Sequence, residues 1–301
     1  MEISVYRLFG WRVGYDRVDP CAAIEGTGGD LMGADPSPRG FKRLLLCGDF
    51  HSGHHFGLTP PEWWEGQHGV LPRLAKIGKF QRALWGFATE AVERLQPVDI
   101  VIVGGDAIDG KGDKSGGVEL RTTDRLEQGE MAAEFINFID APQVRMVFGT
   151  RYHTGKDEDF EQAMIGHIRA NTTIQGHGFF NINNCALDVK HKIGGSTIPH
   201  GRMTSLARAR LWNMLWSERK RQPKANIIAR HHVHYHVFCG DGNWLAFTVP
   251  PLCYGSAFGI RECEGTVDIG MIVVDIFNDG RYTWHSILAD FPEMEAPVEY
   301  L

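Results

Sequence analysis

Four histidines stand within six residues of this chain, and imidazole side chains at such density can hold metal ions. They are His231, His232, His234 and His236, and they follow the apolar run 227–229. A short apolar run of this kind predicts a buried strand, and α/β folds place their ligand sites just beyond the ends of strands. We therefore expect these histidines to complete a metal site whose other ligands follow earlier strands.

Four earlier strand-like runs also end in residues that can bind metals. In chain order these residues are Asp49 with His51, Asp106 with Asp109, His153, and His191. Carboxylate and imidazole together suit Mn, Fe and Zn, and a carboxylate can bridge two cations. Two ions about 3.5–4 Å apart can hold a phosphate and lower the pKa of a water between them. The sequence thus predicts a dinuclear metal site built from five strand ends.

In their order along the chain, these residues resemble the five motifs of the calcineurin-like metallophosphoesterases, phage and bacterial members in particular. The family pattern reads DxH, GDxxD, GNH, H and GHxH. The chain has Gly-Asp-Phe-His, Gly-Asp-Ala-Ile-Asp-Gly, a Gly-to-His turn at 149–153, His191, and His-Val-His at 232–234. The resemblance implies a four-layer αββα sandwich, an α/β fold (α+β in some schemes) in which helices flank two mixed β-sheets.

The resemblance also implies a role for each residue. The implied ligands are Asp49, His51 and His234 for the first metal, His191 and His232 for the second, and Asp106 as the bridge. His153 would lie near the leaving-group oxygen, as general acid or phosphate contact. Asp109 would orient a ligand or His153. The cofactors would be two divalent ions, with Mn preferred and Fe, Zn or Ni as alternatives.

Two departures from the family pattern affect this assignment. The turn 149–153 is two residues longer than GNH and lacks its asparagine ligand. Thr150 is the nearest oxygen donor and a poor substitute, so the second site could be weaker, or completed by water or substrate. His231 replaces the family's glycine, which leaves two frames open: His232 with His234, or His234 with His236. We prefer the first pair because it follows the strand end directly.

Several further residues could face a substrate. Arg151, inside the catalytic turn, could clamp a phosphate oxygen bidentately or form a structural ion pair. Thr150 shares that turn, and His200 and Arg202 lie in a loop after His191 that could reach the substrate. The basic cluster within 208–224 is a solvated helix face or a track for a polyanion. The tryptophans at 212 and 216 are expected in the core rather than as a stacking platform.

Composition and pattern bound the protein class. A net charge of −6, with 43% hydrophobic and 23% charged residues, is typical of a soluble enzyme and does not indicate overall binding to nucleic acid or membrane. The chain has no apolar run of about 20 residues and no recognisable signal peptide, so we expect a cytoplasmic protein, in the host if phage-encoded. Residues 1–40 read as an irregular extension and 41–301 as one metallophosphoesterase domain.

Periodicity predicts the elements that position the site. Helices are expected at 79–96, 124–140, 157–170 and 205–221, alternating in the first half with strands at 43–47, 98–103 and 144–148. Further strands are expected at 186–190, 225–229, 244–249, 270–277 and 281–288.

The function implied is metal-dependent hydrolysis of a phosphate ester, most simply a nucleotide or nucleic-acid phosphodiester, by hydroxide held between the metals. The alternatives are a phosphomonoesterase or protein phosphatase, and a degenerate member that binds metal or phosphate without turnover. The oligomeric state is left open.

Overall fold

Two β-sheets form the centre of the fold. The structure, a computed structural model, describes residues 39–65, 72–113, 115–155, 159–254 and 266–291. The first sheet has the strand order β11 (Tyr282–Ala289), β10 (Ile269–Phe277), β1 (Phe41–Cys47), β2 (Ile100–Val103), β3 (Gln143–Val147) and β4 (Asn171–Gln175). The second has the order β5 (Gly178–Ile182), β6 (Cys185–Lys190), β7 (Ile227–Arg230), β9 (Trp244–Thr248) and β8 (Phe238–Asp241). Each sheet contains both parallel and antiparallel pairs, so both are mixed.

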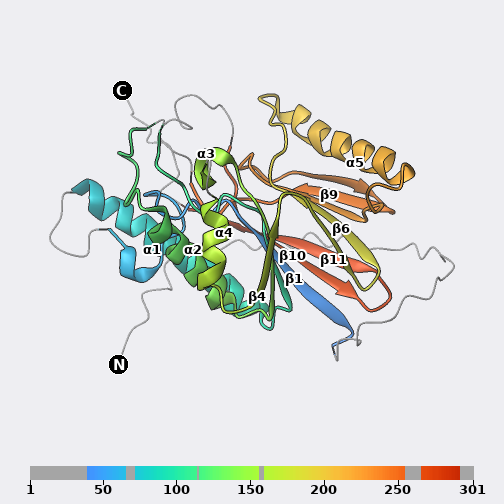
Figure 1. The fold of residues 1–301 in the computed structure, drawn as a ribbon, viewed down its shortest axis with the longest axis horizontal. Coiled ribbons are helices and arrows are strands. Elements are labelled where there is room, and N and C mark those ends of the chain that lie inside the picture. The colour runs from blue at the N-terminus through green and yellow to red at the C-terminus, as the bar shows by residue number, and fades with distance from the viewer. Residues whose placement is uncertain (1–38, 66–71, 114, 156–158, 255–265, 292–301) are drawn as a thin grey trace, which may run out of the picture.

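Helices cover the outer faces of the two sheets (Figure 1). The helices α1 (Pro72–Leu95), α2 (Arg125–Ile139) and α4 (Phe160–Met164) pack on the first sheet, and α5 (Arg202–Glu218) packs on the second. The short helix α3 (Arg151–Thr154) and the 3₁₀ turns η2 (Pro61–Trp63), η3 (Ile165–His167) and η4 (Pro199–Gly201) belong to the connections. The predicted four-layer αββα sandwich is confirmed. The predicted extension 1–40 lies outside the described residues, apart from its last two.

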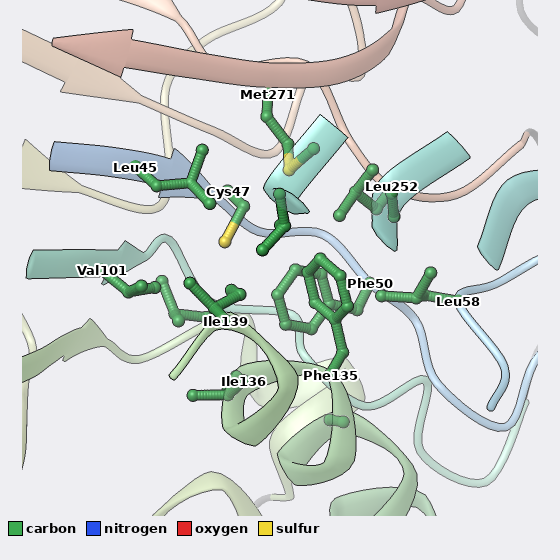
Figure 2. Packing of buried hydrophobic residues seen from close by; sticks show 14 of the residues in the cluster. Leu45, Cys47, Phe50, Leu58, Val101, Phe135, Ile136, Ile139, Leu252 and Met271 are labelled. Carbon is green, nitrogen blue, oxygen red and sulfur yellow. The ribbon is translucent and has the colours of Figure 1, made fainter. Parts of the chain in front are cut away.

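Strand β1 shows why the central strands could be predicted from apolar runs in the sequence. Leu44 and Leu46 face the second sheet, whereas Leu45 and Cys47 face the helices, and all four are buried. Because both faces of the strand are covered, its sequence is an unbroken apolar run. The core under α2 extends to Phe50, just beyond the strand (Figure 2). The ring of Phe50 packs edge-on against that of Phe135, with ring centres 5.7 Å apart.

Three strands were not predicted, and all three lie at sheet edges. β4, β5 and β8 each pair with a single neighbour. Edge strands keep one side open to solvent and therefore need no continuous apolar run. The sequence Asn-Thr-Thr-Ile-Gln of β4 alternates between exposed and half-buried positions, so it carried too weak a signal.

Two helix predictions need correction. The helix expected at 157–170 is only the five-residue α4 followed by η3, because Gly166, a weak helix former, falls where the chain turns toward β4. The helix expected at 79–96 begins earlier, at Pro72. No described helix has the length and apolarity needed to span a membrane.

The expected burial of Trp212 and Trp216 is wrong, since these side chains are 56% and 39% exposed. Helix α5 turns its other side to the second sheet, where Leu206 and Asn213 are buried. The Asn213 side chain donates to Asp188 (3.3 Å) and to the Pro223 carbonyl (3.1 Å). These polar anchors fix the rotation of the helix and leave the indoles outside.

Candidate metal centre

The five predicted strand ends converge at one edge of the sandwich. The loops after β1 and β2 are joined by backbone bonds from Asp49 N to Gly105 O (2.9 Å) and from His51 N to Asp106 O (3.0 Å). In the second sheet, the His231 N–H donates to the His191 carbonyl (2.9 Å). Backbone hydrogen bonds thus connect the loops of the first sheet to one another and the loops of the second sheet to one another. The two sets of loops face each other across the centre.

Most of the predicted ligands have a left-handed backbone conformation, which sets the direction of their side chains. The structure describes nine non-glycine residues with positive φ, and five of these are predicted ligands: Asp49, His51, Asp106, His232 and His234, with φ between 46° and 76°. Each such residue costs roughly 1–3 kcal/mol and persists only where the surrounding fold imposes it. The concentration of this strain at one place indicates that side-chain direction there matters to function.

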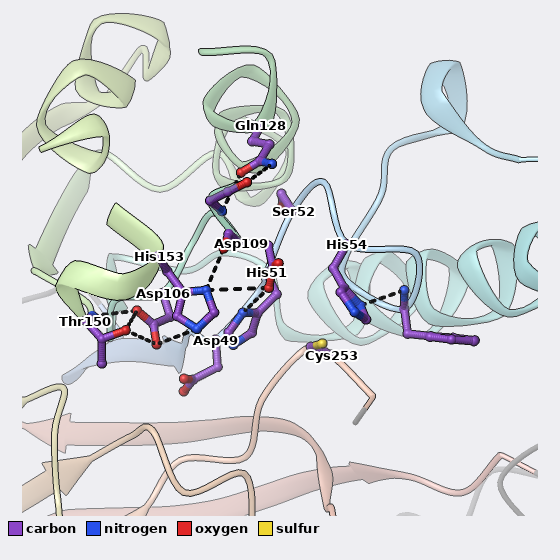
Figure 3. A network of polar contacts seen from close by, with 12 residues as sticks. Asp49, His51, Ser52, His54, Asp106, Asp109, Gln128, Thr150, His153 and Cys253 are labelled. Atoms are coloured by element: carbon purple, nitrogen blue, oxygen red, sulfur yellow. Dashed lines mark hydrogen bonds and ion pairs between the residues drawn. The ribbon is translucent and has the colours of Figure 1, made fainter. Parts of the chain in front are cut away.

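The first group of candidate ligands is Asp49, His51 and His234, whose donor atoms lie within 4.8 Å of one another. Nδ1 of His51 donates to Asp109 Oδ1 at 2.9 Å, which leaves the lone pair of neutral His51 on Nε2 (Figure 3). This Nε2 lies 3.2 Å from Nε2 of His234, which is 3.5 Å from Asp49 Oδ1. Imidazole nitrogens and a carboxylate oxygen thus point at one place, as the ligands of a cation do.

The second group is Asp106, His191 and His232, again within 4.8 Å. His191 Nδ1 donates to the Gly104 carbonyl (2.7 Å), and its Nε2 lies 3.0 Å from Asp106 Oδ2. The His232 N–H donates to Asp49 Oδ2 at 3.3 Å, which places this group directly beside the first. The two groups together give the donor set expected for a pair of neighbouring divalent ions.

Charge in the centre also fits a cation. Burial would raise the pKa of the Asp49 carboxyl, but the neighbouring His231 and His234 lower it well below its usual value. Burial likewise opposes ionisation of Asp106, but His191 lowers its pKa to about 2. Asp49 Oδ1 and His191 Nε2 are buried, and each faces another candidate ligand, His234 at 3.5 Å and Asp106 at 3.0 Å. Two ionised, buried carboxylates that face imidazole nitrogens are what a bound metal would satisfy.

His191 should release its proton when a divalent ion binds. Burial lowers its pKa, but the contact with Asp106 outweighs burial and raises that pKa to about 9. The metal-free imidazole is therefore protonated near pH 7, whereas a metal ligand must be neutral. We expect Mn²⁺ affinity to rise with pH until about 9. Calorimetric titrations near pH 7 in two buffers of different ionisation enthalpy measure the proton, and equal apparent enthalpies would contradict its release.

The raised pKa of His191 also makes the stability of the metal-free chain depend on pH. Because this pKa lies above the ordinary value of 6.5, protonated His191 contributes its full stabilisation of the fold below pH 6.5. The contribution is lost as the pH rises through about 9.

Asp109 and His153 form the next layer around these groups. His153 Nδ1 donates to the Asp109 carbonyl (2.6 Å) and lies 3.6 Å from Asp109 Oδ1, which His51 also contacts. His153 Nε2 is 4.0 Å from Asp106 Oδ2, facing the centre (Figure 3). One aspartate therefore orients both a candidate ligand and the candidate acid, so Asp109 is better suited to positioning than to ligation.

The predicted substrate residues lie at different distances from the centre. The Thr150 N–H donates to Asp106 Oδ1 (2.6 Å), and its hydroxyl is 3.2 and 3.3 Å from the two Asp106 oxygens. Arg151 is exposed at the start of α3, and His200 is exposed in η4. Arg202 lies 4.3 Å over the Tyr235 ring and donates to Thr266 (2.9 Å). Of these four residues, Thr150 is the one that hydrogen-bonds to a candidate ligand, whereas Arg202 packs on Tyr235, the residue next to His234.

The histidine run divides into distinct environments. His232 and His234 join the two groups, whereas His236 Nδ1 donates to the Thr248 carbonyl (2.7 Å) beside Trp284. His231 is fully buried, and its Nδ1 lies 3.5 Å from Asp49 Oδ2. Its ring fills space left by Gly104, where an added Cβ would come within 1.9 Å of the imidazole. The structure thus brings His232 and His234, not His236, to the centre.

Glu161 is a site residue that sequence reasoning missed. Its two carboxylate oxygens accept from the Ala107 N–H and the Gly149 N–H, both at 2.8 Å. These amides belong to the loops that carry Asp106 and His153, so one fully buried side chain ties the two loops together. Burial, then the charge of Asp106, raises the pKa of Glu161 to about 8. It lies eight positions after His153 in the sequence, and no familiar motif spacing marks it.

Glu161→Gln should weaken Mn²⁺ binding or activity by about 10–100-fold, the usual effect of losing a partner that positions metal ligands. A glutamine offers one oxygen where two are used, and its amide would face a backbone N–H. Metal titration of the folded variant measures the effect. Glu130→Gln, on the exposed part of α2, is the matched control. Unchanged affinity in the Glu161 variant would show that the clamp is dispensable.

Comparison with known proteins gives structural similarities alone. No family model and no curated protein matches the chain. A Zn²⁺ complex of Vps29 from Entamoeba histolytica is 12% identical, covers 82% of this chain and 98% of its own, and has a TM-score of 0.40. An archaeal phosphodiesterase is 12% identical over 81% and 99% of the two chains, with a TM-score of 0.39. An NAD nucleotidase from Haemophilus influenzae is 9% identical over 82% and 50%, also with a TM-score of 0.39. Similarities this distant do not decide activity.

Proposed function

We propose that this chain is a metal-dependent phosphoesterase of the calcineurin-like type that hydrolyses a phosphodiester of a nucleotide or nucleic acid. The observation that carries the proposal is the meeting of two ligand groups, Asp49, His51 and His234 beside Asp106, His191 and His232, at four strand ends. The choice of a diester rests on the motif resemblance. The motif resemblance assigns Asp106 to both ions; its Oδ2 lies 3.0 Å from His191 Nε2, and its Oδ1 accepts from the Thr150 N–H.

Two bound divalent ions would neutralise phosphate charge and lower the pKa of a water between them. The chain itself supplies orientation: Asp109 holds His51 with its Nε2 toward the centre, and the Gly104 carbonyl holds His191 in the same sense. Because these contacts occupy Nδ1 of both rings, Nε2 is the atom that can serve as a ligand, in His191 once its proton has been released. The protein's own contacts therefore orient both imidazoles.

His153 is suited to assist the leaving group. Its Nδ1–H is occupied by the Asp109 carbonyl, so Nε2 carries a proton only in the imidazolium form. That proton, facing the centre, can pass to the departing oxygen. Arg151, two residues before His153, is exposed, and a guanidinium there can pair with a phosphate oxygen of the substrate.

A metal-binding member without turnover is the second candidate. It is favoured by the absent asparagine ligand and by Thr150, whose hydroxyl is turned to Asp106 and not presented as a separate ligand. This candidate predicts a single tightly bound ion and no hydrolysis with any divalent metal.

The test is a Mn²⁺-supplemented screen of phosphate mono- and diesters. We expect hydrolysis of bis-p-nitrophenyl phosphate that disappears with a chelator and returns with Mn²⁺. Faster hydrolysis of monoesters would move the substrate class to a phosphatase. No turnover with Mn²⁺, Fe²⁺, Zn²⁺ or Ni²⁺, together with one bound ion per chain, would establish the non-catalytic candidate.

A further inference from the structure

Helix α5 presents large apolar side chains to solvent. The side chains concerned, each between 39% and 56% exposed, are Met203, Leu211, Trp212, Met214, Leu215 and Trp216. The helix forms the outermost layer over the second sheet (Figure 1), and its opposite side is anchored by buried Leu206 and Asn213. The buried anchors thus fix the rotation of the helix. Apolar side chains exposed together in this way are typical of a surface that binds another molecule.

Two indoles lie between two cations along one stripe of this face. Arg208, Trp212 and Trp216 stand at i, i+4 and i+8, and Arg219 follows three residues later. Residues four apart lie on the same side of a helix, about 6 Å apart along its axis. The Arg219 guanidinium lies 5.7 Å from the Trp216 ring centre. Such a stripe offers two stacking surfaces with a positive charge at each end.

The charge of this region opposes that of the rest of the chain. Segment 202–224 holds seven basic residues and one acidic residue, a net charge of +6 in a chain whose total is −6. The basic residues are Arg202, Arg208, Arg210, Arg219, Lys220, Arg221 and Lys224, of which Arg210 is buried on the inner side of the helix and donates to the Ala225 carbonyl. A second copy docked through this face would bring like charges together, so the charge favours an anionic ligand.

The stripe begins beside the metal centre. Arg208 lies against the loop after His191, since a Cβ added to Gly194 would stand 3.2 Å from its Nη2. At the start of the helix, Arg202 stacks on Tyr235, the neighbour of His234. A chain-like anion leaving the centre would therefore meet α5 next.

We propose that the stripe Arg208–Trp212–Trp216–Arg219, with the basic turn 220–224, binds single-stranded nucleic acid and leads it to the metal centre. The inference rests on the proposed function, and it narrows the proposed substrate from a nucleotide or a nucleic acid to single-stranded nucleic acid. Bases of any sequence stack on exposed aromatic rings while arginine and lysine pair with phosphates, which is how strand-binding proteins bind without sequence preference. Two open indoles between cations supply both interactions.

Binding is measured without turnover, on Asp106→Asn protein, with a labelled oligothymidylate of about 16 nucleotides. Adding Trp212→Leu and Trp216→Leu together should weaken binding by at least about fivefold, the low end for loss of one stacked base. Charge reversal at Arg219 and Lys220 should lower the slope of affinity against salt. Leu211→Ala with Leu215→Ala, on the same face but off the stripe, is the control and should keep full affinity.

Three results would overturn the proposal: no oligonucleotide binding, equal affinity after the two tryptophan replacements, or an equal loss in the leucine control. An equal loss in the leucine control together with a concentration-dependent dimer in gel filtration would assign the face to binding a second copy of the chain. The same loss together with binding to anionic vesicles would assign it to a lipid surface. Failure of the proposed function is seen separately, as absence of small-diester hydrolysis by the unaltered chain.

Discussion

Replacing Asp106 with asparagine should reduce bis-p-nitrophenyl phosphate hydrolysis by about 10³-fold or more, because a bridging carboxylate underlies several kcal/mol of charge stabilisation. Asparagine keeps an amide oxygen for the Thr150 N–H and tolerates the left-handed backbone at this position (φ 48°). The variant should therefore fold normally. Steady-state rates across Mn²⁺ concentrations measure the loss, and circular dichroism checks the fold.

His236→Ala is the matched control for this substitution. His236 belongs to the same histidine run as two predicted ligands, but its ring bonds to the Thr248 carbonyl outside the centre. We expect activity within a fewfold of the unaltered chain. If this variant lost as much activity as Asp106→Asn, the assignment of His232 and His234 would be contradicted.

Replacing His153 with alanine should slow hydrolysis by about 10²–10⁴-fold for diesters with poor leaving groups, the usual contribution of a general acid. The loss should be much smaller for p-nitrophenyl esters, whose leaving group departs without a proton. Substrates that differ only in leaving group measure this contrast. A loss that does not depend on the leaving group would assign His153 to phosphate binding instead.

The pH profile tests the same role. Burial, followed by repulsion from His51, lowers the pKa of His153 below its ordinary value. Because the acid acts in its protonated form, its contribution should be present below that lowered pKa and fade as the pH rises through it. The profile of His153→Ala should lack this limb when compared on a substrate with a poor leaving group.

The sequence was sufficient for the sheet centres and the strand ends. Strands such as β1 and β2 are buried on both faces, so their apolar runs are unbroken and their ends are sharply marked. Metal-binding residue types directly after such ends could therefore be placed together before any coordinates were known. The sequence favoured His232 over His236 because His232 follows the strand end directly, and the contact of His236 with the Thr248 carbonyl, outside the centre, agrees with that choice.

Other parts depended on contacts that no local pattern encodes. Glu161 acts through two backbone amides, and nothing in its neighbourhood distinguishes it from a surface glutamate. The rotation of α5 depends on Asn213 reaching Asp188, so periodicity alone placed the wrong side inward. His231 replaces a family glycine, and its ring is accommodated because glycine occupies position 104.

The centre combines backbone strain and buried charge at one place. Five left-handed ligands reduce the stability of a metal-free chain, and bound ions would offset that cost. We therefore expect Mn²⁺ to raise the melting temperature, and chelators to lower it, even where no substrate is present.

The most direct measurement is the electron paramagnetic resonance spectrum of the Mn²⁺-loaded chain, combined with its metal content. A centre that joins the group of Asp49 to the group of Asp106 predicts two ions per chain and a spin-coupled signal. The coupling should be lost in Asp106→Asn. Two ions with the spectrum of isolated Mn²⁺, or at most one ion per chain, would contradict a dinuclear centre at these strand ends.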